Sequence, residues 1–484
     1  MKLIDSYLLY TGNSDIVQTV EGLQATGQTG QITLFGAEAP AALPAGCGFL
    51  SAADPFGSQS LKAIAAQAEA PYTLLYTKDT ILSLGMFALE RMMRILEDSG
   101  AAMVYADHYQ LKGGQQTIAP VIDYQQGSLR DDFDFGSVIL LRTAALKEAA
   151  ARMKTDYRFA GLYDLRLKLS QRGELVHINE YLYTEVENDT RRSGEKIFDY
   201  VDPKNRNRQL EMEAACTEHL KEVGGYLKPE FEHIEFDRGD FEYEASVIIP
   251  VRNRIRTIRD AIRSVLTQQA DFRFNLIVID NHSTDGTTEA IDEFCSDPRL
   301  IHLIPERNDL GIGGCWNLGV HHPCCGKFAV QLDSDDVYKD EHTLATMVRA
   351  FYEQNCAMVV GTYMMTNFDM QMIPPGIIDH REWTPENGRN NALRINGLGA
   401  PRAFYTPVLR EVKVPNTSYG EDYALGLAFS RRFQIGRVYD VVYLCRRWDD
   451  NSDASLDVVK MNAHNLYKDR IRTWELQARI ALNR

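Results

Sequence analysis

Short apolar runs alternate with helical patterns in residues 245–335, and this alternation constrains the fold more than any other feature. A helical spacing of apolar residues over 258–266 separates the first two runs. Strands that alternate with helices build parallel sheets, and such sheets bind ligands beyond the carboxyl ends of their strands. The sequence therefore predicts an α/β fold with a ligand site at one sheet edge. The apolar runs are 245–249, 275–279, 301–304 and 328–330.

An acidic run directly follows the last of these predicted strands. Asp333, Asp335 and Asp336 lie within four positions, immediately after residues 328–330. If the strand continued through this run, Asp333 and Asp335 would project to the same face, because side chains alternate along a strand. Paired carboxylates suit Mg²⁺ or Mn²⁺, which take oxygen ligands and often share them with a phosphate. An acidic turn without a metal is the simpler alternative, since Asp and Ser favour turns.

The bulk composition indicates a globular protein of more than one domain. A length of 484 residues exceeds what one core normally organises. The net charge of −15 argues against a general nucleic-acid partner, which requires a basic surface. No apolar run spans a bilayer, and residues 1–5 lack the apolar core of a signal peptide. With eight cysteines and no signal, we expect a cytoplasmic protein with free thiols, either soluble or at the inner face of the membrane.

Residues 241–454 resemble a family 2 glycosyltransferase of the GT-A fold. The resemblance depends on the order and spacing of short motifs between positions 250 and 423, each of which is weak alone. The motifs are residues 250–253, Asp280 with 283–287, Asn308, Gly311, Asn317 with Gly319, Asp333 with Asp335, and residues 420–423.

The resemblance implies a role for each matched residue. Asp335 would bind the metal ion, Mn²⁺ or Mg²⁺, while Asp333 would contact the ribose or a metal-bound water and Asp336 would assist. The metal would bridge the donor diphosphate and stabilise its charge as it leaves. Asp280 would accept hydrogen bonds from the base or ribose of the donor. The implied nucleotide-sugar contacts are Pro250, Arg252, Asn253, Asp280, Asn308, Gly311, Asn317, Asp333 and Arg447.

Glycines near position 311 are a further part of the expected donor site. Gly311, Gly313 and Gly314 would let the backbone approach a ligand closely, because glycine has no side chain. A flexible turn is the alternative explanation for the same glycines.

Asp422 is the implied general base, with Glu421 as the neighbouring alternative. Residues 423–429 carry an apolar helical pattern, so both carboxylates should lie at the start of a helix. From there Asp422 would take the proton of an acceptor hydroxyl as its oxygen attacks the anomeric carbon, which inverts the sugar configuration. An ordinary acidic helix start is the alternative, since carboxylates favour the positive end of a helix.

Two positions depart from the family pattern. Trp316 stands where family members often carry Arg, and no His follows the last predicted strand. Asp449 or Asp450 could replace that His as a metal ligand, and Arg446 or Arg447 could hold the diphosphate. A plain exposed charge cluster would explain the same residues.

The first half of the chain repeats landmarks of the second half at nearly constant offsets. Asp79 aligns with Asp335 at an offset of 335 − 79 = 256, and Tyr163 aligns with Tyr423 at 423 − 163 = 260. The acids are not repeated, because residues 77–78 are Thr and Lys and residues 161–162 are Gly and Leu. We therefore expect two tandem GT-A (Rossmann-like) domains, the first of them non-catalytic. A second active transferase, as in a bifunctional polysaccharide polymerase, is the alternative for the first half.

The expected domain organisation has four parts. A degenerate domain over 1–190 and a helical linker over 191–240 precede the catalytic domain over 241–454, and an amphipathic helical segment covers 455–484. That last segment would dock onto the protein, or contact a membrane or another copy of the chain. Its expected apolar stripe comprises Val459, Ala463, Leu466, Ile471, Trp474, Ala478 and Leu482.

These features predict a metal-dependent inverting glycosyltransferase. It would move a sugar from a nucleotide-sugar, with a UDP-sugar favoured, to a hydroxyl of a glycan, a lipid-linked glycan or a protein. A non-catalytic scaffold that binds sugar nucleotides or glycans is one alternative, which the acids at 333, 335 and 422 argue against. A nucleotidyltransferase is another alternative. It would normally show a Gly-rich, Lys-containing phosphate loop near its N-terminus, and this sequence shows none.

Overall fold

The computed structural model describes residues 2–187, 205–448 and 456–484, and these form two compact units. The first unit contains residues 2–187, 205–226 and 456–484, and the second contains residues 227–448. The chain thus passes from the first unit into the second and then returns. In its described part, the expected linker 191–240 is divided between the two units instead of standing alone.

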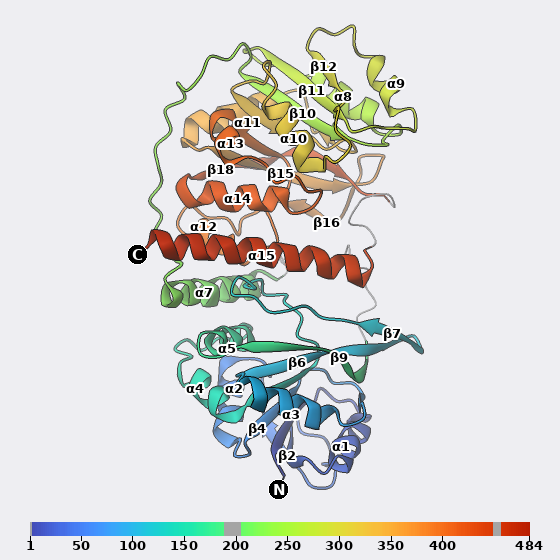
Figure 1. The fold of residues 1–484 in the computed structure, drawn as a ribbon, viewed down its shortest axis with the longest axis vertical. Coiled ribbons are helices and arrows are strands. Elements are labelled where there is room, and N and C mark those ends of the chain that lie inside the picture. Colours follow the sequence, from blue (N-terminus) through green and yellow to red (C-terminus); the bar gives the residue numbers. More distant parts are fainter. Residues whose placement is uncertain (1, 188–204, 449–455) are drawn as a thin grey trace. The chain divides into compact units, whose positions relative to one another are not determined.

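Each unit is built on one mixed sheet with helices packed against it (Figure 1). The described elements of the first unit are β1 (Ile4–Leu9), α1 (Ile16–Ala25), β2 (Thr29–Gly36), β3 (Cys47–Ser51), α2 (Ser58–Gln67), β4 (Tyr72–Tyr76), β5 (Leu82–Leu84), α3 (Ala88–Ser99), β6 (Met103–Lys112), β7 (Gln115–Ala119), β8 (Val138–Arg142), α4 (Thr143–Ala151), α5 (Gly161–Ser170), β9 (Leu175–Val186), α7 (Arg206–Val223) and α15 (Val458–Leu482). Those of the second unit are β10 (Ala245–Val251), α8 (Ile258–Leu266), β11 (Phe274–Asp280), α9 (Thr287–Asp292), β12 (Leu300–Leu303), α10 (Ile312–Val320), β13 (Phe328–Gln331), β14 (Val337–Tyr338), α11 (Thr343–Gln354), β15 (Met358–Thr366), β16 (Met372–Ile378), α12 (Gly388–Asn391), β17 (Arg402–Tyr405), α13 (Thr406–Val412), α14 (Glu421–Arg432) and β18 (Ile435–Arg446).

The two sheets have the same strand order. The first runs β3-β2-β1-β4-β8-β6-β9-β5 with β7 paired to β6, and the second runs β12-β11-β10-β13-β17-β15-β18-β14 with β16 paired to β15. In both, the first four strands are parallel, and the fifth is antiparallel to its neighbours. The expected α/β fold with two tandem domains is therefore confirmed, although each sheet is mixed and not wholly parallel.

Burial on both faces explains why the central strands read as continuous apolar runs. All seven residues of β11 are buried, and in β10 only Pro250 is partly exposed. Helix α8 covers the sheet with Ile258, Ile262 and Val265, which its helical spacing places on one face. These elements hold the carboxyl ends of β10 and β13 next to one another, since the two strands are parallel neighbours.

Helix α15 docks onto the first unit through a face that differs from the predicted one. Val459, Trp474 and Leu482 of the expected apolar stripe are 62%, 56% and 63% exposed. The helix instead buries mainly charged side chains, which are Lys468, Asp469, Arg472, Glu475 and Arg479, together with Ile471 and Leu476. The predicted apolar stripe is thus largely wrong. Within the described residues, no helix is long and apolar enough to cross a membrane.

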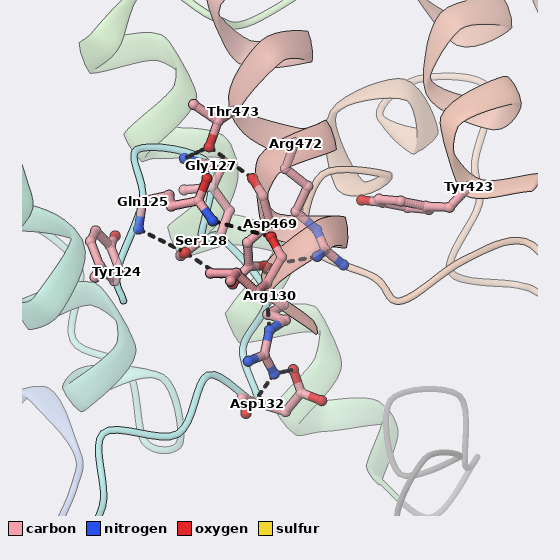
Figure 2. Close-up of polar contacts among 12 residues, drawn as sticks. Tyr124, Gln125, Gly127, Ser128, Arg130, Asp132, Tyr423, Asp469, Arg472 and Thr473 are labelled. Atoms are coloured by element: carbon pink, nitrogen blue, oxygen red, sulfur yellow. Dashed lines mark hydrogen bonds and ion pairs between the residues drawn. The ribbon is translucent and has the colours of Figure 1, made fainter. Parts of the chain in front are cut away.

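A loop of the first unit provides partners for this charged face (Figure 2). The Ser128 hydroxyl donates to Asp469 Oδ2 at 3.0 Å, and Arg472 Nη1 lies 2.9 Å from Asp469 Oδ1. The Gly127 backbone N–H donates to Thr473 Oγ1 at 2.9 Å. A Cβ atom at Gly127 would lie 2.1 Å from Thr473 N, so only glycine permits this approach. Charge pairing and backbone fit, more than apolar burial, therefore hold α15 in place.

We expect the change Asp469→Ala to destabilise the first unit. Asp469 is fully buried beside the guanidinium groups of Arg472 and Arg130, the latter at 3.4 Å, and its loss leaves buried positive charge uncompensated. Removing one partner of such a pair typically costs about 3–5 kcal/mol. Urea unfolding followed by pulse proteolysis, with fragments identified by mass spectrometry, measures each unit separately. Asp98→Ala, at a side chain that is 63% exposed, is the matched control, and an equal effect in both variants would contradict the docking described above.

Candidate functional site

A cavity of about 510 Å³ lies in the second unit where β10 and β13 end. This is the sheet edge at which the sequence predicts a ligand site. Five carboxylates and four guanidinium groups line it together with apolar side chains. The charged lining residues are Asp333, Asp335, Asp336, Glu421, Asp422, Arg252, Arg254, Arg402 and Arg447.

The acidic run forms a turn and does not extend the strand. Strand β13 ends at Gln331, and the Asp336 backbone N–H donates to the carbonyl oxygen of Asp333 at 3.1 Å. The expectation that alternation along a strand brings Asp333 and Asp335 to one face is therefore wrong. The turn achieves the same result, because Asp333, Asp335 and Asp336 all line the cavity.

The protein holds these three carboxylates in different ways. Asp333 Oδ1 accepts from Gln331 Nε2 at 2.8 Å. Asp336 is almost fully buried, and its Oδ1 accepts from the Arg446 backbone N–H at 2.7 Å. Asp335 Oδ2 lies 3.4 Å from Trp448 Nε1 and 3.8 Å from Arg254 Nε, and the Asp335 carbonyl oxygen accepts from Arg446 Nε at 2.6 Å. The three carboxylates thus reach the same cavity from one turn through different sets of contacts.

Burial makes negative charge costly in this cavity. It raises the pKa of Asp333 and raises the pKa of Asp336 well above its usual value, and the charge of Asp335 adds to both shifts. Burial, with the charge of Asp422, also raises the pKa of Glu421 to about 8. Within the described chain, Glu421 Oε2 is buried without a hydrogen-bond partner. A set of carboxylate oxygens in this state fits a divalent cation such as Mg²⁺ or Mn²⁺.

Asp422 lies at the start of α14, where the sequence predicts it. Helix α14 begins at Glu421, and Arg402 Nη1 donates to Asp422 Oδ2 at 2.6 Å. Arg402 is held in turn by the Leu398 carbonyl oxygen at 2.6 Å. No sequence pattern points to Arg402, because only the antiparallel pairing of β17 with β13 brings it into the cavity.

Several predicted contact residues do not line the cavity. Asp280 is fully buried, and its two oxygens accept from the Ser283 backbone N–H at 3.0 Å and from Thr288 Oγ1 at 2.5 Å. Asn253 Oδ1 similarly accepts from the Thr284 backbone N–H at 2.8 Å. These groups hold the turn after β11, and their contact with a nucleotide stays a prediction. The predicted residues outside the lining are Asn253, Asp280, Asn308, Gly311 and Asn317, and Asp449 and Asp450 lie outside the described residues.

The glycines near position 311 make room for the chain itself. A Cβ atom at Gly313 would lie 1.8 Å from the Pro415 carbonyl oxygen, and one at Gly311 would lie 2.7 Å from the Thr417 carbonyl carbon. Asn317 fixes the same loop, since its side chain donates to the Val414 carbonyl at 2.6 Å and accepts from the Val414 backbone N–H at 3.0 Å. The structure thus gives these glycines a packing role, and their approach to a ligand stays a prediction.

Aromatic side chains complete the cavity wall. Trp316, at one of the positions that depart from the family pattern, is buried with its ring edge-on to Phe404 at 6.1 Å. Trp448 lies outside the lining, with its ring 5.8 Å from the Arg254 guanidinium and 5.3 Å from that of Arg256. Trp316 therefore lines the cavity by packing and supplies no positive charge there.

This part of the chain is similar to known glycosyltransferases. Residues 246–405 match the model of glycosyl transferase family 2. The chain is 39% identical over 198 residues to an uncharacterized glycosyltransferase of Rickettsia felis, a match covering 40% of this chain and 31% of that protein. It is 28% identical over 120 residues to the putative teichuronic acid biosynthesis glycosyltransferase TuaG of Bacillus subtilis, covering 25% of this chain and 46% of TuaG. The chain thus spans less than half the length of these relatives.

Solved structures also resemble the chain. A TarS fragment of S. aureus in complex with UDP-GlcNAc is 21% identical, with a TM-score of 0.38 over 49% of this chain and 72% of that one. The mannosyltransferase PcManGT of Pyrobaculum calidifontis, in complex with GDP-Man and Mn²⁺, is 16% identical, with a TM-score of 0.33 over 56% of this chain and 82% of that one.

In the first unit, the side chains of the corresponding turn form ion pairs and hydrogen bonds with other residues of that unit. Because β4 occupies the place of β13, residues 77–80 occupy the place of 333–336. Lys78 Nζ there contacts Glu185 and lies 3.3 Å from Glu187 Oε2. Asp79 Oδ2 accepts from the Thr11 backbone N–H at 2.8 Å. An internal ammonium group thus lies in this turn, which supports the prediction that the first unit is not catalytic.

We expect Glu185 to make the stability of the first unit depend on pH. Burial alone would raise the pKa of Glu185, but the neighbouring His108 and Lys78 outweigh burial and lower it from 4.5 to about 2. Since the folded pKa is the lower one, the stabilisation is complete above pH 4.5 and is lost as the pH falls towards 2. Between pH 6 and pH 3, the free energy of unfolding of the first unit should fall by about 2 kcal/mol more in the wild type than in Glu185→Gln.

Urea unfolding of the first unit at the two pH values measures this difference. Glu97→Gln, at an exposed position, serves as the control, and its stability should depend on pH as that of the wild type does. If the stability of Glu185→Gln depended on pH as strongly as that of the wild type, Lys78 and Glu185 would not form a stabilising ion pair.

Proposed function

Because residues 246–405 match the model of glycosyl transferase family 2, we propose that the second unit transfers a sugar from a nucleotide-sugar donor to an acceptor hydroxyl. The proposed reaction uses a UDP-sugar and a divalent metal ion and inverts the sugar configuration. The acceptor hydroxyl belongs to a glycan, a lipid-linked glycan or a protein. The observation that carries this proposal is that the acids of the 333–336 turn and those at the start of α14 line one cavity.

On the donor side, Asp335 and Asp333 would hold Mn²⁺ or Mg²⁺. When bound, the metal ion supplies positive charge that stabilises the departing diphosphate. Arg254 and Arg447 also line the cavity and would neutralise the remaining phosphate charge. Asp336 contributes less directly, because one of its oxygens already accepts from the Arg446 backbone.

On the acceptor side, Asp422 is the better candidate for the general base. The raised pKa of Glu421, about 8, favours its protonated form at neutral pH, and a protonated carboxyl cannot accept a proton. The hydrogen bond from Arg402 fixes Asp422 Oδ2, and the Tyr423 backbone N–H donates to Asp422 Oδ1 at 2.7 Å. Asp422 would thus be held in a fixed position at the start of α14, where it would take the proton of the acceptor hydroxyl.

Replacing Asp335 should abolish transfer without unfolding the chain. Asp335 lines the cavity, and Asp335→Asn removes the negative charge that would hold the metal ion while it keeps the side-chain shape. Release of UDP from a panel of UDP-sugars, with and without Mn²⁺, measures the reaction and also identifies the donor. Asp340→Asn, at an exposed position shortly after the turn, is the matched control. Full Mn²⁺-dependent activity in Asp335→Asn would rule out this metal assignment.

Replacing Asp422 should separate donor binding from turnover. Asp422→Asn keeps an oxygen for Arg402 but removes the base, so turnover should fall by roughly 100-fold or more. The affinity for UDP in the presence of Mn²⁺, measured by calorimetry, should stay within a factor of about three. Normal turnover in this variant would eliminate Asp422 as the base. Loss of UDP affinity together with turnover would instead assign it to donor binding.

A further inference from the structure

The first unit contains a cavity of about 310 Å³ at the place that corresponds to the candidate active site of the second. The two sheets share one strand order, so residues can be matched by strand register. Leu75 of β4 corresponds to Gln331 of β13. Leu75 lies opposite Ile139, and Gln331 lies opposite Arg402, so Ile139 corresponds to Arg402. Helices α5 and α14 start at corresponding points, so Leu162 matches Asp422.

The cavity is retained in the first unit, but its chemistry is different. At the matched positions, Gln331, Arg402 and Asp422 line the cavity of the second unit, whereas the first unit has only aliphatic side chains. The aliphatic side chains at these positions cannot form the hydrogen bonds that a sugar or a ribose requires. The matched pairs are Leu75 with Gln331, Ile139 with Arg402, Leu141 with Phe404, Leu162 with Asp422, and Leu165 with Leu425.

Four phenyl rings and a buried cation also line the cavity. Phe56, Phe133, Phe135 and Phe159 line the cavity, and Phe159 is 37% exposed. Arg166 is 5% exposed, and its guanidinium donates to the carbonyl oxygens of Ser128 at 2.8 Å and Arg130 at 2.5 Å. Across the described ranges, no carboxylate lies within 4.0 Å of it. Arg166 therefore places a positive charge in the wall that no carboxylate compensates.

Two further arginines line the same cavity from more exposed positions. Arg158 pairs with Asp54 at 2.7 Å, and Arg208 of α7 is exposed and forms no ion pair with any described residue. Asp131 also lines the cavity, so three guanidinium groups face two carboxylates. The cavity thus combines an apolar interior with net positive charge.

We propose that this cavity binds the hydrocarbon chain of an anionic amphiphile, an alkyl or prenyl phosphate, with the phosphate held by the arginines. Aliphatic and aromatic walls favour a hydrocarbon, and guanidinium groups match phosphate oxygens in geometry and charge. A volume of about 310 Å³ falls at the small end of ligand pockets, which suits part of a chain. The proposal rests on the first unit alone, so the transfer reaction proposed for the second unit can fail without affecting it.

Calorimetric titration of the full chain with dodecyl phosphate, below its micelle concentration, tests the proposal. Saturable binding of one molecule is expected. Inorganic phosphate should not bind measurably, since it lacks the chain, and dodecanoate should bind at least tenfold more weakly, since a carboxylate has fewer oxygens for the arginines. Absence of saturable binding would overturn the proposal. Equal binding of dodecanoate would overturn the assignment of phosphate as the head group.

Two variants locate the binding site. Arg208→Glu, at an exposed position, should weaken binding of dodecyl phosphate at least tenfold, whereas Arg94→Glu on α3 makes the same charge change away from the cavity and should leave it unchanged. Leu162→Asp introduces into the partly exposed wall the carboxylate that the second unit has, and it should abolish binding. Circular dichroism and the urea midpoint check folding. Wild-type affinity in both Arg208→Glu and Leu162→Asp would overturn the assignment to this cavity.

Discussion

The repulsion among carboxylates that share a buried cavity is the constraint on which the second unit depends. Asp333, Asp335 and Asp336 enter from one turn, and Glu421 and Asp422 enter from the start of α14. Burial raises the pKa of Asp333, Asp336 and Glu421, so the fold tolerates this cluster at a cost in free energy. Arg402 offsets part of that cost by pairing with Asp422. A divalent cation, as in the proposed function, would offset more of it.

One strand order supports two different chemical environments in this chain. In the second unit Gln331, Arg402 and Asp422 line the cavity, and in the first unit the matched positions carry leucine and isoleucine. The turn after β4 holds Lys78 against Glu185 and Glu187, where the second unit has its three aspartates. The backbone topology thus provides a cavity in both units, while the side chains at its edge decide what each cavity can bind.

The sequence predicted the features that depend on local patterns. The apolar runs of β10 and β11, the start of α14 at Glu421 and the landmarks repeated between the halves all follow from periodicity and short motifs. The sequence could not reveal Arg402, since its place in the cavity depends on an antiparallel pairing of distant strands. It also misidentified the buried face of α15, because ion pairs such as Arg472 with Asp469 make charged residues suitable for burial. The packing role of Gly313 likewise depends on Pro415, which is distant in sequence.

The most direct test is the anomalous scattering of manganese in crystals grown with Mn²⁺ and UDP. We expect one strong peak in the cavity of the second unit, for a manganese ion bound to an oxygen of Asp335 and to the diphosphate, with Asp422 lining the same cavity. A manganese ion bound elsewhere, or UDP bound in that cavity with no metal at Asp335, would contradict it.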